Sequence, residues 1–210
     1  MSSAARIGLA PGAIDTAQAA LSRQTPNARE SSLSVSLEGR SLSLEGVPRP
    51  RGRDLSGPEL ELFVNELADR PELWIDLVEH DRTQRVYREL LHDEHLTAWL
   101  ICWMDQHDTG FHDHDVSAGA LAVVSGAVRE QRLAIDGPPV DRTFRAGGGF
   151  HFSASDIHRV RHAGEDPAVT LHVYSPPLVN MGSYVIAARG VLERHPVSYR
   201  EELRHSERPG

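Results

Sequence analysis

Two histidines separated by one residue mark the stretch of the chain best suited to chemistry. They lie in the segment GFHDH, residues 110–114. In a β-strand, residues i and i+2 point to the same face, so His112 and His114 would present two imidazoles side by side, while Asp113 points the other way. Two inward histidines on one barrel strand form a chelate that still lacks one or two ligands. His158, on a distant predicted strand, is our candidate for the third ligand.

The expected ligand set contains no carboxylate. The residues that follow the histidine pair, 116–120, read VSAGA. Three neutral imidazoles would leave the charge of a divalent ion uncompensated by the protein. Zinc with three histidines and water fits this donor set, and so does ferrous iron with positions open to substrate and O₂. An anionic substrate such as a thiolate would supply the missing negative charge.

The composition narrows the classes of function. Of the 12 histidines in the 210 residues, ten lie between positions 80 and 172, and the formal net charge is −8. The acidic balance argues against a nucleic-acid partner. The absence of lysine excludes Schiff-base and P-loop lysine chemistry, and the single cysteine, Cys102, excludes an internal disulfide and a cysteine-based zinc site. Because Cys102 lies in an apolar strand, we expect it to be buried.

The pattern before the histidine pair predicts helices. Ser56 with Glu59 three residues later is typical of a helix start, and apolar residues follow at helical spacing up to Leu67. Pro71 interrupts this pattern. Residues 73–78 predict a second short helix. Both helices would pack against the scaffold that carries the chemistry.

The pattern after about residue 82 predicts an all-β fold. Short apolar runs alternate with turns rich in Gly and Pro, which indicates a sandwich or barrel. Asp113 and Asp115, beside the histidine pair, are expected to point outward into solvent. The predicted strands are residues 97–104, 118–124, 128–135, 150–152, 158–162 and 169–174.

The chain divides into one domain and two flanking segments. Residues 1–53 are rich in Ser, Ala, Gly and Pro and contain no aromatic residue, which predicts a mostly disordered extension, with a short strand pair at 33–45 as an option. Residues 54–196 would form the domain and 197–210 a polar tail. No secretory signal and no membrane span are expected, so we expect a cytoplasmic protein without a membrane partner. We also expect a monomer.

Four short motifs resemble the cysteine dioxygenase family of the cupin superfamily. They are ICW at 101–103, HDH at 112–114, HRV at 158–160 and TLHVYSPP at 170–177, and together they span about residues 82–178. The resemblance implies a cupin double-stranded β-helix, a cofactor Fe(II) held by His112, His114 and His158, and oxidation of a small thiol by O₂ to its sulfinic acid. For this chain we expect L-cysteine as substrate and cysteine sulfinic acid as product.

The last motif supplies the expected catalytic residues. Thr170, His172 and Tyr174 lie at i, i+2 and i+4, so a hydroxyl, an imidazole and a phenol share one strand face and can form a hydrogen-bonded relay. In the family these positions are usually Ser, His and Tyr. A further departure is Gly119, where animal members carry a cysteine that is cross-linked to the tyrosine, so this chain cannot form that thioether.

The residues that would bind the substrate are less well defined. The family has an arginine two residues after a tyrosine, and it binds the substrate carboxylate. Here Glu89 follows Tyr87 at that distance. Strand parity favours Arg85 as the substitute and nearness in sequence favours Arg88, which a one-residue bulge would turn inward. Tyr87 and both arginines are therefore our substrate-binding candidates.

Three other functions remain open at this point. A related branch oxidises 3-mercaptopropionate and lacks the arginine at this position. A zinc or manganese isomerase or hydrolase could use the same histidines. A cupin could also serve as a binding module without catalysis.

Overall fold

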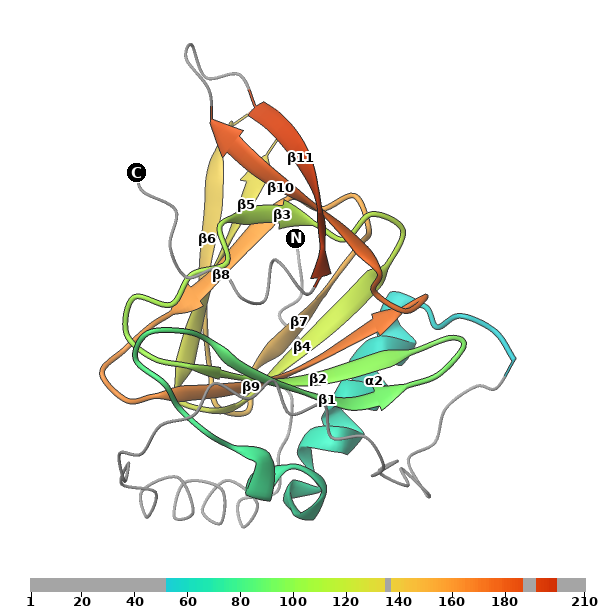
Figure 1. The fold of residues 1–210 in the computed structure, drawn as a ribbon, viewed down its shortest axis with the longest axis vertical. Coiled ribbons are helices and arrows are strands. Elements are labelled where there is room, and N and C mark those ends of the chain that lie inside the picture. Colours follow the sequence, from blue (N-terminus) through green and yellow to red (C-terminus); the bar gives the residue numbers. More distant parts are fainter. Residues whose placement is uncertain (1–51, 135–136, 187–191, 200–210) are drawn as a thin grey trace.

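Two packed antiparallel sheets form the body of the molecule (Figure 1). The structure is a computed structural model that describes residues 52–134, 137–186 and 192–199. One sheet has the strand order β1-β2-β9-β4-β7 and the other β11-β10-β3-β8-β5-β6. This arrangement confirms the all-β cupin double-stranded β-helix predicted from the sequence. The strands are β1 Val86–His92, β2 Thr97–Trp103, β3 Phe111–Asp113, β4 Ala118–Ser125, β5 Ala127–Ala134, β6 Gly137–Arg145, β7 Gly149–Phe152, β8 His158–His162, β9 Ala168–Ser175, β10 Asn180–Ile186 and β11 Leu192–Ser198.

In the described part of the chain one α-helix precedes the strands, as the sequence predicts. Helix α2, Gly57–Ala68, begins after a capping box in which the backbone N–H of Ser56 donates to the Glu59 carboxylate at 2.8 Å. Its apolar face is buried against β4, β7 and β9. The domain start predicted at residue 54 is not tested, and neither is the extension at 1–53, because residues 1–51 lie outside the described part.

The second helix predicted at 73–78 is wrong in detail. The chain forms two one-turn 3₁₀ helices, η1 Pro71–Leu73 and η2 Ile75–Leu77. They are separated by Trp74, whose φ of −140° is not helical. Its buried indole N–H donates to the carbonyl of Leu67 at 3.0 Å, so burial of this side chain interrupts the helix.

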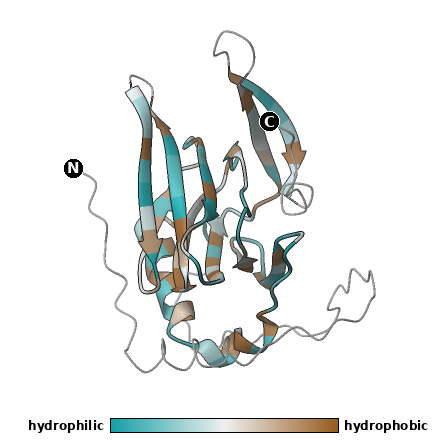
Figure 2. Cartoon of the chain, turned by 90° about the vertical axis from the view of Figure 1, so that its left-hand side faces the viewer, coloured by the Kyte–Doolittle hydropathy of each residue, from teal (hydrophilic) through white to brown (hydrophobic). Residues whose placement is uncertain are grey.

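The five-stranded sheet separates two apolar cores. Along β2, Ala98, Leu100 and Cys102 face the helical side, whereas Trp99, Ile101 and Trp103 face the space between the sheets. Both faces of β2 are therefore buried, which explains its continuous apolar run. Figure 2 shows hydrophobic and hydrophilic bands alternating along several strands. Cys102 is buried, as expected.

Three strands were not predicted. Strand β6 begins with Pro138 and Pro139, which read as a turn but are tolerated because β6 lies at a sheet edge. Strands β10 and β11 form a hairpin at the top of Figure 1, beyond residues 169–174, the last strand that the sequence predicts. No helix among the described residues is long and apolar enough to span a membrane.

Candidate metal centre

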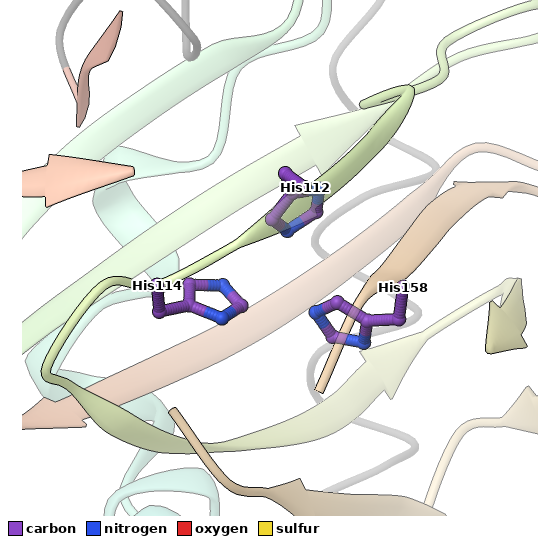
Figure 3. A group of neighbouring side chains, drawn as sticks. All are labelled: His112, His114 and His158. Carbon is purple, nitrogen blue, oxygen red and sulfur yellow. The ribbon is translucent and has the colours of Figure 1, made fainter. Parts of the chain in front are cut away.

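Three histidines from two strands of the six-stranded sheet converge between the sheets (Figure 3). His112 lies on β3 and His114 directly follows it, while His158 begins β8 and is the register partner of His112. All three side chains are buried, and one ligand nitrogen from each lies within 4.8 Å of the others. The structure therefore brings together the three imidazoles that the sequence singled out.

The hydrogen bonds around these rings fix which nitrogens are available. The Nδ1–H of His112 donates to the carbonyl of Gly110 at 3.0 Å, because a carbonyl can only accept. The Nδ1–H of His158 donates to Glu130 at 3.0 Å. Among the described residues nothing hydrogen-bonds to the buried His158 Nε2 or His114 Nδ1. Buried nitrogens without partners, aimed at a shared space, fit a metal ion.

Electrostatics favour the ligating form of these rings. Burial holds the pKa of His112 and of His114 well below the usual value, and the neighbouring imidazole of His158 lowers both further. Neutral imidazole is the form that binds metals. In the part of the chain that the structure describes, no carboxylate joins the cluster, so a bound divalent ion would keep its charge for an anionic ligand.

A chain of hydrogen bonds runs along β9 next to the cluster. Trp103 donates its indole N–H to Thr170 Oγ1 at 2.8 Å, Thr170 Oγ1 lies 2.8 Å from His172 Nε2, and His172 Nδ1 lies 3.2 Å from the Tyr174 hydroxyl. The Tyr174 ring centroid is 5.3 Å from that of His114. The predicted alignment of hydroxyl, imidazole and phenol is therefore present and ends beside a candidate ligand.

Burial controls the protonation of this chain. It lowers the pKa of His172 to about 3, with smaller contributions from the charges of His158 and Arg85. It also raises the pKa of Tyr174, which the charge of Arg85 opposes. At neutral pH the relay consists of a neutral imidazole and a protonated phenol.

Gly119 sits at the contact between Phe152 and Tyr174. It is the register partner of both residues on the two neighbouring strands. A Cβ atom at this position would overlap the Phe152 ring and come within 3.0 Å of Tyr174. The Phe152 ring also stacks on His114 at 4.5 Å between centroids and lies 4.7 Å from His158. An aromatic wall thus fills the space beside the ligands and keeps water out.

The two candidate arginines lie on opposite faces of β1. Tyr87 pairs with Ile101, on the inner face, and Arg88 pairs with Leu100, on the helical side. Arg88 is ion-paired with Glu79 at 2.6 Å, and the register shift in β1 comes only after Glu89. The buried guanidinium of Arg85 lies 5.7 Å from the Trp103 ring centroid. The structure therefore brings Arg85 towards the site and turns Arg88 away.

Two acidic residues differ from expectation. Asp113 is buried rather than solvated, because Arg194 binds its carboxylate through Nε at 2.7 Å and Nη2 at 2.9 Å. The sequence analysis missed Glu130, a fully buried carboxylate. Burial tends to raise its pKa, but the hydrogen bond from His158 and the charge of Arg132 lower it to about 2. In the sequence Glu130 lies in the polar run REQR at 129–132, which gives no sign that its side chain is buried.

Comparisons with known proteins agree with this geometry. The chain is 25% identical over 135 residues to cysteine dioxygenase type 1 of Danio rerio, covering 57% of this chain and 65% of that protein. It is 26% identical over 139 residues to cysteine dioxygenase type 1 of Rattus norvegicus, covering 60% and 68%. The chain thus spans about two thirds of the length of these relatives.

A structural comparison gives more distant matches. A solved protein from Klebsiella pneumoniae, described as having a double-stranded β-helix domain, matches 48% of this chain and 80% of its own, with 14% identity and a TM-score of 0.43. A solved protein from Thermus thermophilus matches 48% of this chain and 91% of its own, with 18% identity and a TM-score of 0.43.

A family model matches most of the domain. The model described as cysteine dioxygenase type I matches residues 62–185, which is more than half of the 210 residues and includes all three clustered histidines. The chain belongs to the cysteine dioxygenase type I family.

Proposed function

We propose that this protein is a non-haem iron(II) thiol dioxygenase that converts L-cysteine and O₂ into cysteine sulfinic acid. The observation that carries this proposal is the convergence of three buried imidazoles, with no carboxylate of the described residues among them, beside a phenol held by a hydrogen-bonded relay. Family membership supports the same chemistry. Both oxygen atoms end on one sulfur, so the reaction needs no further reductant.

His112, His114 and His158 would hold the ion. Fe(II) bound there would lower the pKa of the substrate thiol and supply the redox chemistry that the reaction of a thiolate with O₂ needs. The negative thiolate would compensate part of the positive charge of the ion, which three histidine ligands leave uncompensated. Phe152 packs on two of the rings and excludes water from that side.

The relay positions the phenol of Tyr174. Thr170 accepts the Trp103 indole N–H, and its own hydroxyl proton has two acceptors, His172 Nε2 at 2.8 Å and the carbonyl of Ile101 at 3.5 Å. The shorter distance favours donation to His172. His172 then carries its proton on Nδ1 and donates it to the Tyr174 oxygen, which leaves the phenol proton free to point at substrate or oxygen. Because the phenol stays protonated, it acts as a hydrogen-bond donor.

Arg85 would bind the substrate carboxylate, with Tyr87 beside it on the same face. Arg85 precedes the first residue of β1 and lies on the inner side, where its charge affects the pKa of both His172 and Tyr174. A guanidinium is well matched to a carboxylate in a buried site, since both groups are planar and can form paired hydrogen bonds. This arrangement favours thiols that also carry a carboxylate.

An oxygen-electrode screen tests the proposal. Iron-loaded protein is mixed with L-cysteine, 3-mercaptopropionate, cysteamine or mercaptosuccinate, with zinc-loaded protein as the control. We expect one O₂ consumed per thiol, fastest with cysteine, slow with cysteamine because it lacks the carboxylate, and none with zinc. Faster turnover of 3-mercaptopropionate would reassign the substrate, and no iron-dependent O₂ uptake with any thiol would overturn the proposal.

A further inference from the structure

A buried carboxylate lies directly behind one of the three clustered histidines. Glu130 is on β5, and Arg132, two residues along, is the register partner of His158 on β8. Glu130 is therefore the diagonal neighbour of His158 on the same face. The side chain of Glu130 is 0% exposed, and its Oε1 accepts the His158 Nδ1–H at 3.0 Å.

Two arginines hold this carboxylate in place. Arg132 donates to Oε1 through Nη2 at 2.8 Å and is itself held by Asp156 at 2.9 Å. Arg142, on β6, donates to Oε2 through Nε at 3.1 Å and also through Nη2. The Arg142 guanidinium lies over the rings of Phe144 and Phe150, at 5.4 and 5.8 Å. With both oxygens occupied and both arginines anchored, the carboxylate is fixed before any ligand arrives.

The position of the carboxylate determines the chemistry of the His158 ring. An ionised carboxylate can only accept, so the ring must carry its proton on Nδ1. The lone pair then lies on Nε2, a buried atom that no described residue hydrogen-bonds. His112 is oriented only by a neutral carbonyl, and among the described residues Glu130 is the one carboxylate that hydrogen-bonds to any of the three rings.

We propose that Glu130 is a positioning residue of the metal centre: it fixes the tautomer and orientation of His158 and thereby increases the affinity of the three histidines for a divalent ion. This inference rests on the metal site of the proposed function but not on its substrate or reaction. A carboxylate that accepts from the second nitrogen of a ligating histidine makes that ring a better donor. Loss of such a partner weakens metal binding by roughly 10- to 100-fold.

The test measures metal affinity rather than turnover. Metal-free full-length protein is titrated with Co(II), followed by its visible absorption and by competition with a chelator, and thermal unfolding is recorded for each variant. We expect Glu130→Gln to bind Co(II) roughly 10- to 100-fold more weakly than the wild type and to alter the absorption spectrum. The control is Val124→Ala, which removes buried apolar atoms from the core on the helical side of the five-stranded sheet and leaves Glu130 and both of its arginines unchanged.

The control separates positioning from stability. If Val124→Ala lowers the melting temperature but leaves the Co(II) affinity within about threefold of wild type, the effect of Glu130→Gln belongs to its contact with His158. Equal weakening by both variants would overturn the inference, and so would wild-type affinity in Glu130→Gln. Failure of the wild type to bind Co(II) at all would instead overturn the metal site itself.

Glu130→Asp serves if the amide variant does not fold. It keeps a negative charge for the arginines and withdraws it from His158 by one methylene group. We expect native-like unfolding with Co(II) affinity between those of the wild type and Glu130→Gln. Wild-type affinity in this variant would contradict the proposed role.

Discussion

At the scale of single residues, position on a strand face decides which arginine can meet a substrate. Arg85 and Arg88 are three residues apart, yet one is buried on the inner side and the other is paired with Glu79 at the outside. Asp113 likewise points to the opposite face of its strand from His112 and His114, because side chains alternate along a strand. Substrate contact is therefore expected from Arg85.

The matched variants Arg85→Gln and Arg88→Gln test this choice. A hydrogen bond to a charged group contributes about 1.5–3 kcal/mol, so Arg85→Gln should raise the KM for cysteine roughly 10- to 100-fold. Its KM for cysteamine, which has no carboxylate, should change little. Steady-state O₂ uptake measures both. If Arg88→Gln raises the KM for cysteine as much as Arg85→Gln does, the assignment is wrong.

The sequence predicts the grouping of residues that are close in the chain. Strand parity is a local rule, so it placed His112 with His114 and aligned Thr170 with His172 and Tyr174. The sequence did not predict the role of Glu130, because its partner His158 is 28 positions away and their contact depends on the register of β5 and β8. In the sequence a charged residue in an alternating strand reads as solvent-facing.

At the scale of elements, the β10–β11 hairpin supports β3, the strand that carries His112 and leads directly into His114. The carboxylate of Asp113 on β3 accepts from Arg194 on β11 and, at 2.6 Å, from the Tyr184 hydroxyl on β10. Arg194 reaches Asp113 by crossing over Gly182, where any Cβ would overlap the guanidinium. The hairpin therefore holds the face of β3 that carries Asp113, while the opposite face points His112 into the metal centre.

Gly182→Ala should release this contact. The guanidinium ends a flexible side chain and can move aside, but the buried Asp113 then loses its hydrogen bonds from Arg194. Such a loss costs about 1–3 kcal/mol, so we expect a lower free energy of unfolding and, because β3 is less firmly held, weaker Co(II) binding. Urea denaturation with a parallel metal titration measures both effects. The control is Gly137→Ala, since a Cβ at Gly137 meets nothing within 4 Å. Unchanged stability in Gly182→Ala would show that the clamp does not contribute.

Two of the three strands that the sequence did not predict are mostly exposed strands at the sheet edges. Strand β2 is apolar on both faces and was readily predicted, whereas β6 and β11 lie at the sheet edges and are mostly exposed. Edge strands tolerate prolines and charges, so they carry neither a clear apolar alternation nor a continuous apolar run. Their pairing depends on neighbours that only the assembled sheet supplies.

At the scale of the whole molecule, the free energy of unfolding of the metal-free protein should fall in acid. Burial lowers the pKa of His112, His114 and His172, whereas unfolding returns each to an ordinary value near 6.5. Below that pH these three histidines bind protons in the unfolded chain but stay neutral in the folded chain. Stability is therefore fully present above about pH 6.5 and is lost as the pH falls.

Unfolding of the metal-free protein against pH should show this loss. Each histidine contributes about 1.4 kcal/mol per pH unit, so the three together give a slope of about 4 kcal/mol per unit below pH 6. His172→Gln should reduce the slope by about one third. Urea titrations in the presence of a chelator measure it. A stability that stays flat from pH 7 to about pH 5 would be incompatible with three buried neutral imidazoles.

The central claim is that the three imidazoles hold an ion that directs both atoms of O₂ to one sulfur. Reaction of the iron-loaded protein with L-cysteine under oxygen-18 gas, followed by mass spectrometry of the product, tests it most directly. We expect a sulfinate with two oxygen-18 atoms from the wild type and no such product from His158→Ala treated in the same way. A product whose oxygen comes from water, or equal labelling by the variant, would contradict it.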